Sequence, residues 1–322
     1  MRGYAVKRFL LIIPTVILIT IILFVVFRFI PGDVVQMLVA QQTWQQEMGT
    51  AAEVDIEAIR HFLGLDIPLH EQYFRWMGNM LQGDLGRSLI TNRQITEELR
   101  TRLPVTFELS LLSMIFTLLC SIPIGMYSAI RQDTAGDYIG RVLSIAFLAI
   151  PSFWVATLVM VYPALWWGWS PPVEYVKFVD NPIANIGQFL IPSIIMGMFT
   201  SGGLMRITRT MMLEVLRQDY IRTAWSKGLR ERLVIMRHAL KNTLIPVVTI
   251  AGGMIPTLLG GSVIIETIFS LPGMGRYLLR AVLDRDFIVV IGWNFVMSLF
   301  VMATIVLTDL AYAFVDPRVR YK

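Results

Sequence analysis

Residues 287–315 read FIVVIGWNFVMSLFVMATIVLTDLAYAFV, a stretch of 29 residues in which Asp309 is the single charged side chain. Crossing about 30 Å of hydrocarbon takes about 20 helical residues, so this segment is long and apolar enough to span a bilayer. Five other segments share these properties: residues 9–30, 104–130, 139–168, 186–205 and 243–265. The sequence therefore predicts an all-α membrane protein with six transmembrane helices.

The composition of the whole chain favours the same class. Of 322 residues, 55% are hydrophobic and 16% are charged, against roughly 25% charged in ordinary soluble proteins. A soluble fold of this size has more surface than so few charges can cover. Cys120 is the only cysteine, which excludes a disulfide scaffold, and the three histidines lie far apart in the sequence, so no metal centre is expected.

Basic residues that flank the spans predict the orientation. Residues 206–241, between the fourth and fifth spans, carry nine Lys and Arg against three Asp and Glu, a net charge of +6. Both ends of the chain are also basic. Because cytoplasmic loops are enriched in Lys and Arg, this loop and both termini are predicted to be cytoplasmic. Topology thus explains the net charge of +5, and nucleic acid is not expected as a partner.

The loop between the first two spans, residues 31–103, is long and carries more acids than bases. Apolar residues recur at helical spacing over 54–63 and again over 69–81, and Gly64 and Pro68 separate the two runs. We expect a small helical extracytoplasmic cap, which either packs on the spans or helps to receive a soluble partner. The chain then divides into residues 1–30, this cap at 31–103, and a core at 104–322.

The cytoplasmic loop contains the most informative segment, EVLRQDYIRTAWSKGLRERLVIMRHALKNTLIPVVT at residues 214–249. It predicts one helix over 213–226 and a second over 231–242 that leads directly into the fifth span. Gly228 lies between them and takes a positive φ at little cost. Two short helices joined by an exposed turn suit a cleft in a soluble protein.

Residues 219–229 (DYIRTAWSKGL), followed by 237–242 (RHALKN) and Pro246, resemble the coupling loop of an ABC-importer permease. More narrowly, the chain is similar to the first permease subunit of the dipeptide, oligopeptide and nickel importer family. Further motifs of that family follow in order at residues 29–33, 64–69, 83–88, 102–106, 150–154, 266–275, 285–286 and 316–318. The sequence departs from the family pattern at Trp225 and in an extended insert at 34–53.

The resemblance implies a type I ABC-importer permease in the plasma (inner) membrane, and it implies partners. These are a second, paralogous permease subunit, two ATP-binding subunits and an extracytoplasmic solute-binding protein. The chain has no phosphate-binding G-x-x-x-x-G-K-[ST] motif, so it is not expected to be an enzyme or to hold a cofactor; ATP and Mg²⁺ are expected on the partner ATPase. By analogy, the residues that face the ATPase are Asp219, Tyr220, Arg222, Thr223, Ala224, Lys227, Gly228 and Leu229.

Polar residues inside spans are costly and usually face a cavity or a partner. Asn294 and Ser298 lie four residues apart on one face of the sixth span and are candidates for the translocation path. A secondary carrier driven by an ion gradient is the alternative function, although no repeat relates the first three spans to the last three. Peptide is the default solute of the family, while nickel, glutathione, opines and oligosaccharides stay open.

Overall fold

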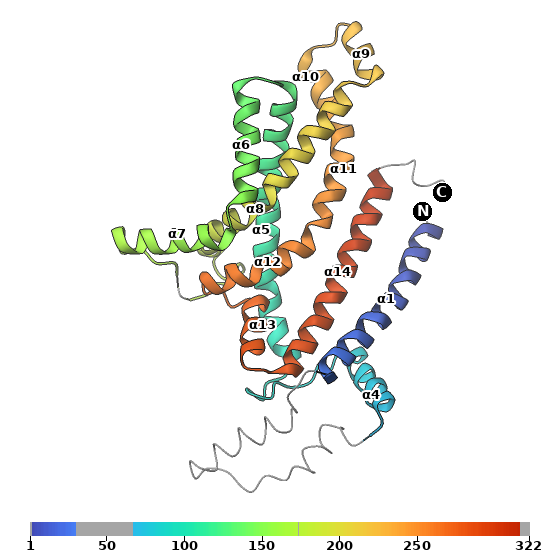
Figure 1. Ribbon diagram of the computed structural model, residues 1–322, viewed down its shortest axis with the longest axis vertical. Coiled ribbons are helices and arrows are strands. Elements are labelled where there is room, and N and C mark those ends of the chain that lie inside the picture. Colours follow the sequence, from blue (N-terminus) through green and yellow to red (C-terminus); the bar gives the residue numbers. More distant parts are fainter. Residues whose placement is uncertain (1, 30–66, 173, 316–322) are drawn as a thin grey trace. The chain divides into compact units, whose positions relative to one another are not determined.

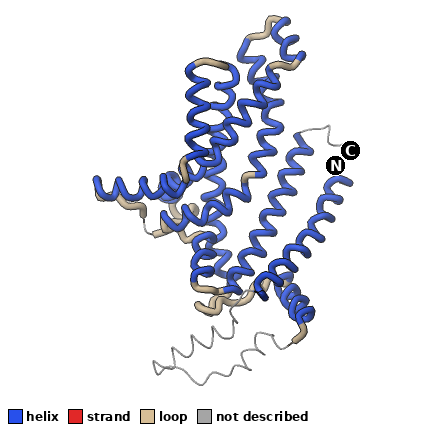
Figure 2. The backbone as a smooth tube through the Cα atoms, viewed as in Figure 1, coloured by secondary structure: helices blue, strands red, loops and turns tan. Residues whose placement is uncertain are grey.

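The computed structural model describes residues 2–29, 67–172 and 174–315. The regular elements among these residues are all helices, joined by turns and loops, and these residues form no extended sheet (Figure 1, Figure 2). The helices are α1 (Arg2–Phe29), α4 (Leu69–Leu81), α5 (Ile95–Ile130), α6 (Ala135–Ala149), α7 (Ser152–Trp167), α8 (Pro182–Leu216), α9 (Asp219–Ser226), α10 (Glu231–Leu233), a π-helix (Val234–Ala239), α11 (Leu240–Gly253), α12 (Ile255–Ile268), α13 (Met274–Leu283) and α14 (Phe287–Val315). The expected all-α class is confirmed.

The structure confirms part of the expected count of six spans. Within the described residues, four helices are long and apolar enough to cross a membrane, namely Ile95–Ile130, Pro182–Leu216, Glu231–Gly253 and Phe287–Thr308. A fifth is reached when α6 and α7 are taken together as one broken span. The apolar part of α1, Ile12–Val26, is shorter than these four helices, and so is α12.

The third expected span, 139–168, is wrong as a straight helix. Instead, α6 and α7 meet at an angle of 88°, and α7 turns away from α6 (Figure 1). Ile150 is extended at φ −85° and ψ 120°, because the ring of Pro151 disfavours the helical region for the residue before it. The fifth expected span, 243–265, is likewise divided between α11 and α12, at Met254.

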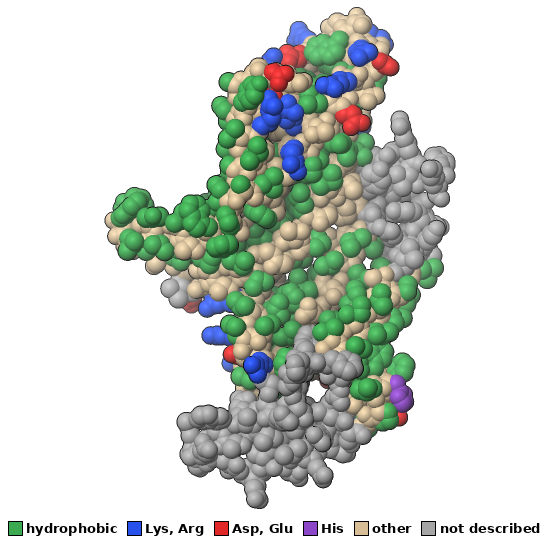
Figure 3. Space-filling model, viewed as in Figure 1, with side chains coloured by type: hydrophobic (Ala, Val, Ile, Leu, Met, Phe, Trp, Pro, Cys, Tyr) green, Lys and Arg blue, Asp and Glu red, His purple; other side chains and the backbone are tan. Residues whose placement is uncertain are grey.

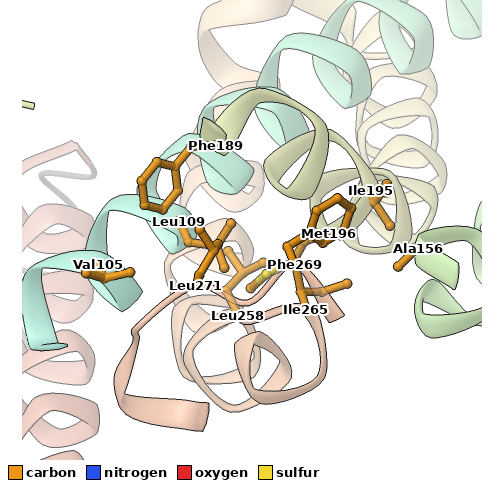
Figure 4. Close-up of a cluster of buried hydrophobic side chains, with 10 residues drawn as sticks. All are labelled: Val105, Leu109, Ala156, Phe189, Ile195, Met196, Leu258, Ile265, Phe269 and Leu271. Carbon is orange, nitrogen blue, oxygen red and sulfur yellow. The ribbon is translucent and has the colours of Figure 1, made fainter. Parts of the chain in front are cut away.

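The chain forms two compact units. Of the described residues, unit 1 takes those within Met1–Phe9, Thr101–Leu279 and Phe300–Lys322, and unit 2 takes those within Leu10–Arg100 and Arg280–Leu299. A large apolar cluster in unit 1 joins side chains of α5, α7, α8 and α12 with the turn that follows α12 (Figure 4). Phe189 and Leu109, two of its members, are fully buried. Burial of this kind fixes these helices against one another.

A buried carboxylate organises the turn after α12 in unit 1. Glu266 is fully buried and accepts hydrogen bonds from the Thr106 hydroxyl at 2.6 Å and the Arg276 backbone N–H at 2.9 Å. The Thr106 hydroxyl oxygen in turn accepts a hydrogen bond from the Met274 N–H at 2.8 Å. A negative charge beside the first turn of α13 is favourable because the helix N-terminus is partly positive.

In unit 2, α4 confirms the helix expected near residues 69–81. The Tyr73 hydroxyl lies 3.0 Å from that of Thr20, and the Trp76 ring packs edge-on against Phe295. Phe74 and Leu81 are exposed on α4. The other helix expected for the cap, over 54–63, and the insert at 34–53 lie outside the described residues.

Candidate functional site

The residues between α8 and the π-helix, 217–233, form a short projection that we call the basic hairpin. The sequence predicts one helix over 213–226, but the structure ends α8 at Leu216 and begins α9 at Asp219. At 3.6 residues per turn, Leu216 and Ile221 would lie about 140° apart around a continuous helix. The break at Arg217 and Gln218 allows side chains from both helices to reach one apolar cluster.

That cluster lies beneath α9 and joins four elements of unit 1. It contains Ala129 of α5, Met212 of α8, Ile221 and Ala224 of α9, and Val234, Ile235 and Ala239 of the π-helix. Met212, Ile221 and Val234 are fully buried. Because its underside is packed against α5, α8 and the π-helix, the hairpin is attached to all three.

Gly228 closes the hairpin with a left-handed turn. Its φ is +71°, as the sequence predicts. The Gly228 N–H donates to the Trp225 carbonyl at 2.9 Å, and the Leu229 N–H donates to the Ala224 carbonyl at 3.4 Å. This pair of bonds is the Schellman arrangement for ending a helix, and the packing of Leu229 into the cluster beside Ala224 completes it. A Cβ at residue 228 would meet no atom within 4 Å, so the requirement for glycine is one of backbone conformation.

The structure places the eight expected ATPase-facing residues in two groups. Six are exposed on the hairpin: Asp219, Tyr220, Arg222, Thr223, Lys227 and Gly228. The other two lie inward, since Ala224 is buried in the cluster and Leu229 is half-buried against it. Trp225 is exposed too, at 44%. Lys and Arg side chains gather over this end of unit 1, above a mainly apolar flank (Figure 3).

The helix after the turn differs from the expected α-helix over 231–242. Three α-helical residues of α10 are followed by the π-helix, and α11 starts at Leu240. Two contacts hold this segment. Arg131, after α5, lies 3.6 Å from the Glu231 carboxylate, and the Asn242 amide donates to the Tyr220 hydroxyl at 2.7 Å. Such π-helical turns frequently occur at functional sites.

Sequence reasoning missed a charged cluster between α6 and α8. Asp137 is fully buried and accepts two bonds from the Arg209 guanidinium, at 2.8 and 2.9 Å. Arg141 and the Asp133 N–H also donate to it, at 2.9 and 3.0 Å. Asp137 and Arg141 stand four residues apart, but Arg209 is 72 residues further along the chain than Asp137, so only the fold reveals the pair.

The two candidates for the translocation path lie in unit 2. Both are half-buried on α14, and each donates to its own helix: the Asn294 amide to the Val290 carbonyl at 2.8 Å, and the Ser298 hydroxyl to the Asn294 carbonyl at 2.7 Å. They share one helix face, as expected. Their role in a solute path stays a prediction.

Comparisons with known proteins agree along the whole chain. The family model described as "Binding-protein-dependent transport system inner membrane component" matches residues 121–321, and the model for the N-terminal part of such components matches residues 1–110. A putative peptide transport system permease protein of Brucella abortus (strain 2308) is 38% identical over 321 residues, covering 100% of both chains.

Other relatives match over the full length of both chains. They include an oligopeptide transport system permease protein of Bacillus subtilis at 36% identity and a glutathione transport system permease protein of Pectobacterium atrosepticum at 35%. Among solved structures, a chain of an amino acid ABC transporter with histidines has a TM-score of 0.53 at 14% identity, covering 67% of this chain and 94% of that one. At that identity, the likeness concerns the fold alone.

Proposed function

Because the chain belongs to the family of binding-protein-dependent transport system inner membrane components, we propose that it forms the translocation path for a peptide or similar small solute and is driven through the basic hairpin. It is a multi-pass ABC permease of the inner membrane and not an enzyme. In the proposal it has the type I fold, counts α1 and the broken α6–α7 pair among six spans, and keeps both termini in the cytoplasm.

The proposed partners follow from the same family. A second, paralogous permease completes the path, two ATP-binding subunits hydrolyse ATP, and an extracytoplasmic binding protein delivers the solute. Relatives named for peptide, oligopeptide and glutathione transport make a short peptide or a peptide-like compound the favoured solute class. The binding protein would set the choice within that class.

The observation that carries the proposal is the construction of the hairpin. Its outer surface presents six exposed residues of the expected coupling set, while its underside is packed on α5, α8 and the π-helix. A partner that binds the outer surface and displaces it would therefore move α5, α8 and the π-helix together. A loop that only satisfied the positive-inside rule would need neither the Schellman turn nor the buried cluster.

Site-specific crosslinking tests the proposal. In the assembled transporter, a cysteine at Thr223, on the exposed surface, should crosslink to the ATP-binding subunit, and the yield should change between the ATP-free and vanadate-trapped states. A cysteine at Lys177, which is exposed in the segment between α7 and α8, is the control and should not crosslink. Absence of the Thr223 product in an active complex would contradict ATPase docking.

The energy source of uptake distinguishes an ATP-driven importer from a carrier driven by an ion gradient. Uptake of a labelled tripeptide into proteoliposomes should need the binding protein, the ATP-binding subunits and ATP on the side of the hairpin. Uptake by the two permeases alone under an imposed ion gradient would instead support the secondary carrier.

A further inference from the structure

The carboxylate of Asp137 makes four hydrogen bonds within unit 1. Arg209 contacts it through both Nε and one terminal nitrogen, while Arg141 and the Asp133 N–H supply the other two donors. The two-pronged contact of a planar guanidinium with a carboxylate fixes the orientation of both groups. The pair therefore specifies how the first turn of α6 lies against α8.

Burial separates this pair from an ordinary surface ion pair. The Asp137 side chain is 0% exposed and that of Arg209 is 18% exposed, whereas Arg141 is 40% exposed. The cost of removing buried charges from water largely cancels their attraction, so such a pair contributes little net stability. Its better-attested effect is to select one geometry.

Both helices joined by the pair are also attached to the basic hairpin. On α8, Met212 follows Arg209 by three residues and is fully buried in the cluster beneath α9. On the other side, the turn that leads into α6 contains Arg131, which pairs with Glu231 of α10. The pair thus lies where displacement of the hairpin would reach α6 and α8 at the same time.

Close packing continues this connection along α6. The Ser144 hydroxyl lies 3.5 Å from the Met205 sulfur, and a Cβ at Gly202 would come within 2.6 Å of the Ser144 carbonyl oxygen. From α6 the chain bends into α7, which packs against α8 and α12. A displacement of α6 would therefore continue into the broken span.

We infer that Asp137 and Arg209 are positioning residues for energy coupling: their buried ion pair makes α6 move with α8 when the ATPase displaces the basic hairpin. This inference rests on the proposed function. It gives the pair a role in transmitting the displacement of the hairpin to α6 and α8, whereas the proposed function concerns the surface that the ATPase contacts.

The test compares single and double variants of the full transporter in proteoliposomes. Asp137→Asn leaves the largely buried Arg209 guanidinium without its carboxylate, and Arg209→Gln leaves the buried Asp137 carboxylate with Arg141 as its one charged partner, so each should lower the yield and thermal stability of the complex. The double variant leaves neither charge and should recover most of both. Arg141→Gln, which removes the exposed partner of the same carboxylate, is the matched control and should behave like the wild type.

Coupling is read separately from stability. In the double variant, the binding protein should no longer raise the ATPase rate above its basal value. In the wild type, spin labels at Ser226 and Val142, both exposed, should keep one distance between ATP-free and vanadate-trapped states. In the double variant that distance should change with the nucleotide state, because α9 then moves without α6.

The outcomes distinguish failure of this inference from failure of the proposed function. A recovered double variant with full stimulation and a constant label distance would reduce the pair to a structural role and overturn the inference. An active complex with Thr223→Cys as its one substitution that fails to crosslink to the ATPase would instead overturn the proposed function. Lost stimulation in a well-assembled double variant, with the crosslink retained, supports the inference.

Discussion

At the scale of single residues, Gly228 and Gly187 form a natural pair for comparison. A Cβ at either position would meet no atom within 4 Å, but Gly228 has φ +71° whereas Gly187 lies within α8. Gly228→Ala should cost about 1–2 kcal/mol, because an L-residue resists the left-handed region. Gly187→Ala should instead gain up to about 1 kcal/mol of helix propensity.

Thermal unfolding of the purified complex measures both changes, and binding-protein-stimulated ATP hydrolysis measures coupling. We expect Gly228→Ala to lose stimulation and a bulky β-branched residue, as in Gly228→Val, to lose it further. Asn tolerates the left-handed conformation better than Ala, so Gly228→Asn should lie between Ala and the wild type. Equal behaviour of the alanine variants at 228 and 187 would show that the turn geometry is irrelevant.

The Glu266 site supports a second prediction at this scale. In Gly273→Ala, the new Cβ would lie 2.3 Å from the Glu266 carboxyl carbon, so the carboxylate would have to leave its donors. Buried groups left without partners cost about 1–3 kcal/mol, and the unfolding temperature of the complex should fall accordingly. Gly253→Ala, at a helical glycine with no atom within 4 Å of its Cβ position, is the control and should cause no comparable fall.

At the scale of elements, the bend between α6 and α7 has two supports. Pro151 disfavours a helical Ile150, and Ala156 of α7 is fully buried in the cluster with α8 and α12. If packing dominates, Pro151→Ala should keep the bend, and spin labels at Val142 and Leu165 should keep their distance. Ala156→Leu overpacks that cluster, which typically costs about 1–3 kcal/mol, and should change the distance. A straightened helix in Pro151→Ala would show that proline alone sets the bend.

The same elements show how far the sequence predicts structure. Apolar length alone located α5, α8 and α14, and the Gly228 turn followed from its neighbours in the chain. The 88° bend was missed because apolar composition continues through Pro151, and hydropathy does not record direction. The breaks at Arg217 and within 234–239 were missed because they depend on side chains of α5 and α8 that meet α9 only in the folded chain.

At the scale of the whole molecule, composition predicted a membrane protein and the resemblance of its motifs to a known family predicted a permease, which the family match confirms. The candidate site was only partly predictable. Resemblance selected eight positions by their place in a motif, and the fold shows that Ala224 and Leu229 support the turn from within. The pair of Asp137 with Arg209 was invisible because its members are distant in sequence and Arg209 looked like one more topology-setting base.

Orientation in the membrane gives a final prediction, argued from one helix. Lys177 lies before α8 in the sequence, and Ser226 lies after α8, at the end of α9. Both residues are exposed. The 35 residues of α8 extend about 52 Å, longer than the hydrocarbon core, so we predict that the two positions lie on opposite sides of the bilayer. The positive-inside rule then puts Ser226 in the cytoplasm.

With Cys120 replaced by alanine, a membrane-impermeant maleimide should label Lys177→Cys but not Ser226→Cys in cells whose inner membrane is intact and accessible from outside. Inverted vesicles should give the reverse. Labelling of Ser226→Cys from outside would place the basic hairpin away from ATP, and a cytoplasmic ATPase could then not reach it. The accessibility pattern therefore tests a condition that every coupling experiment above assumes.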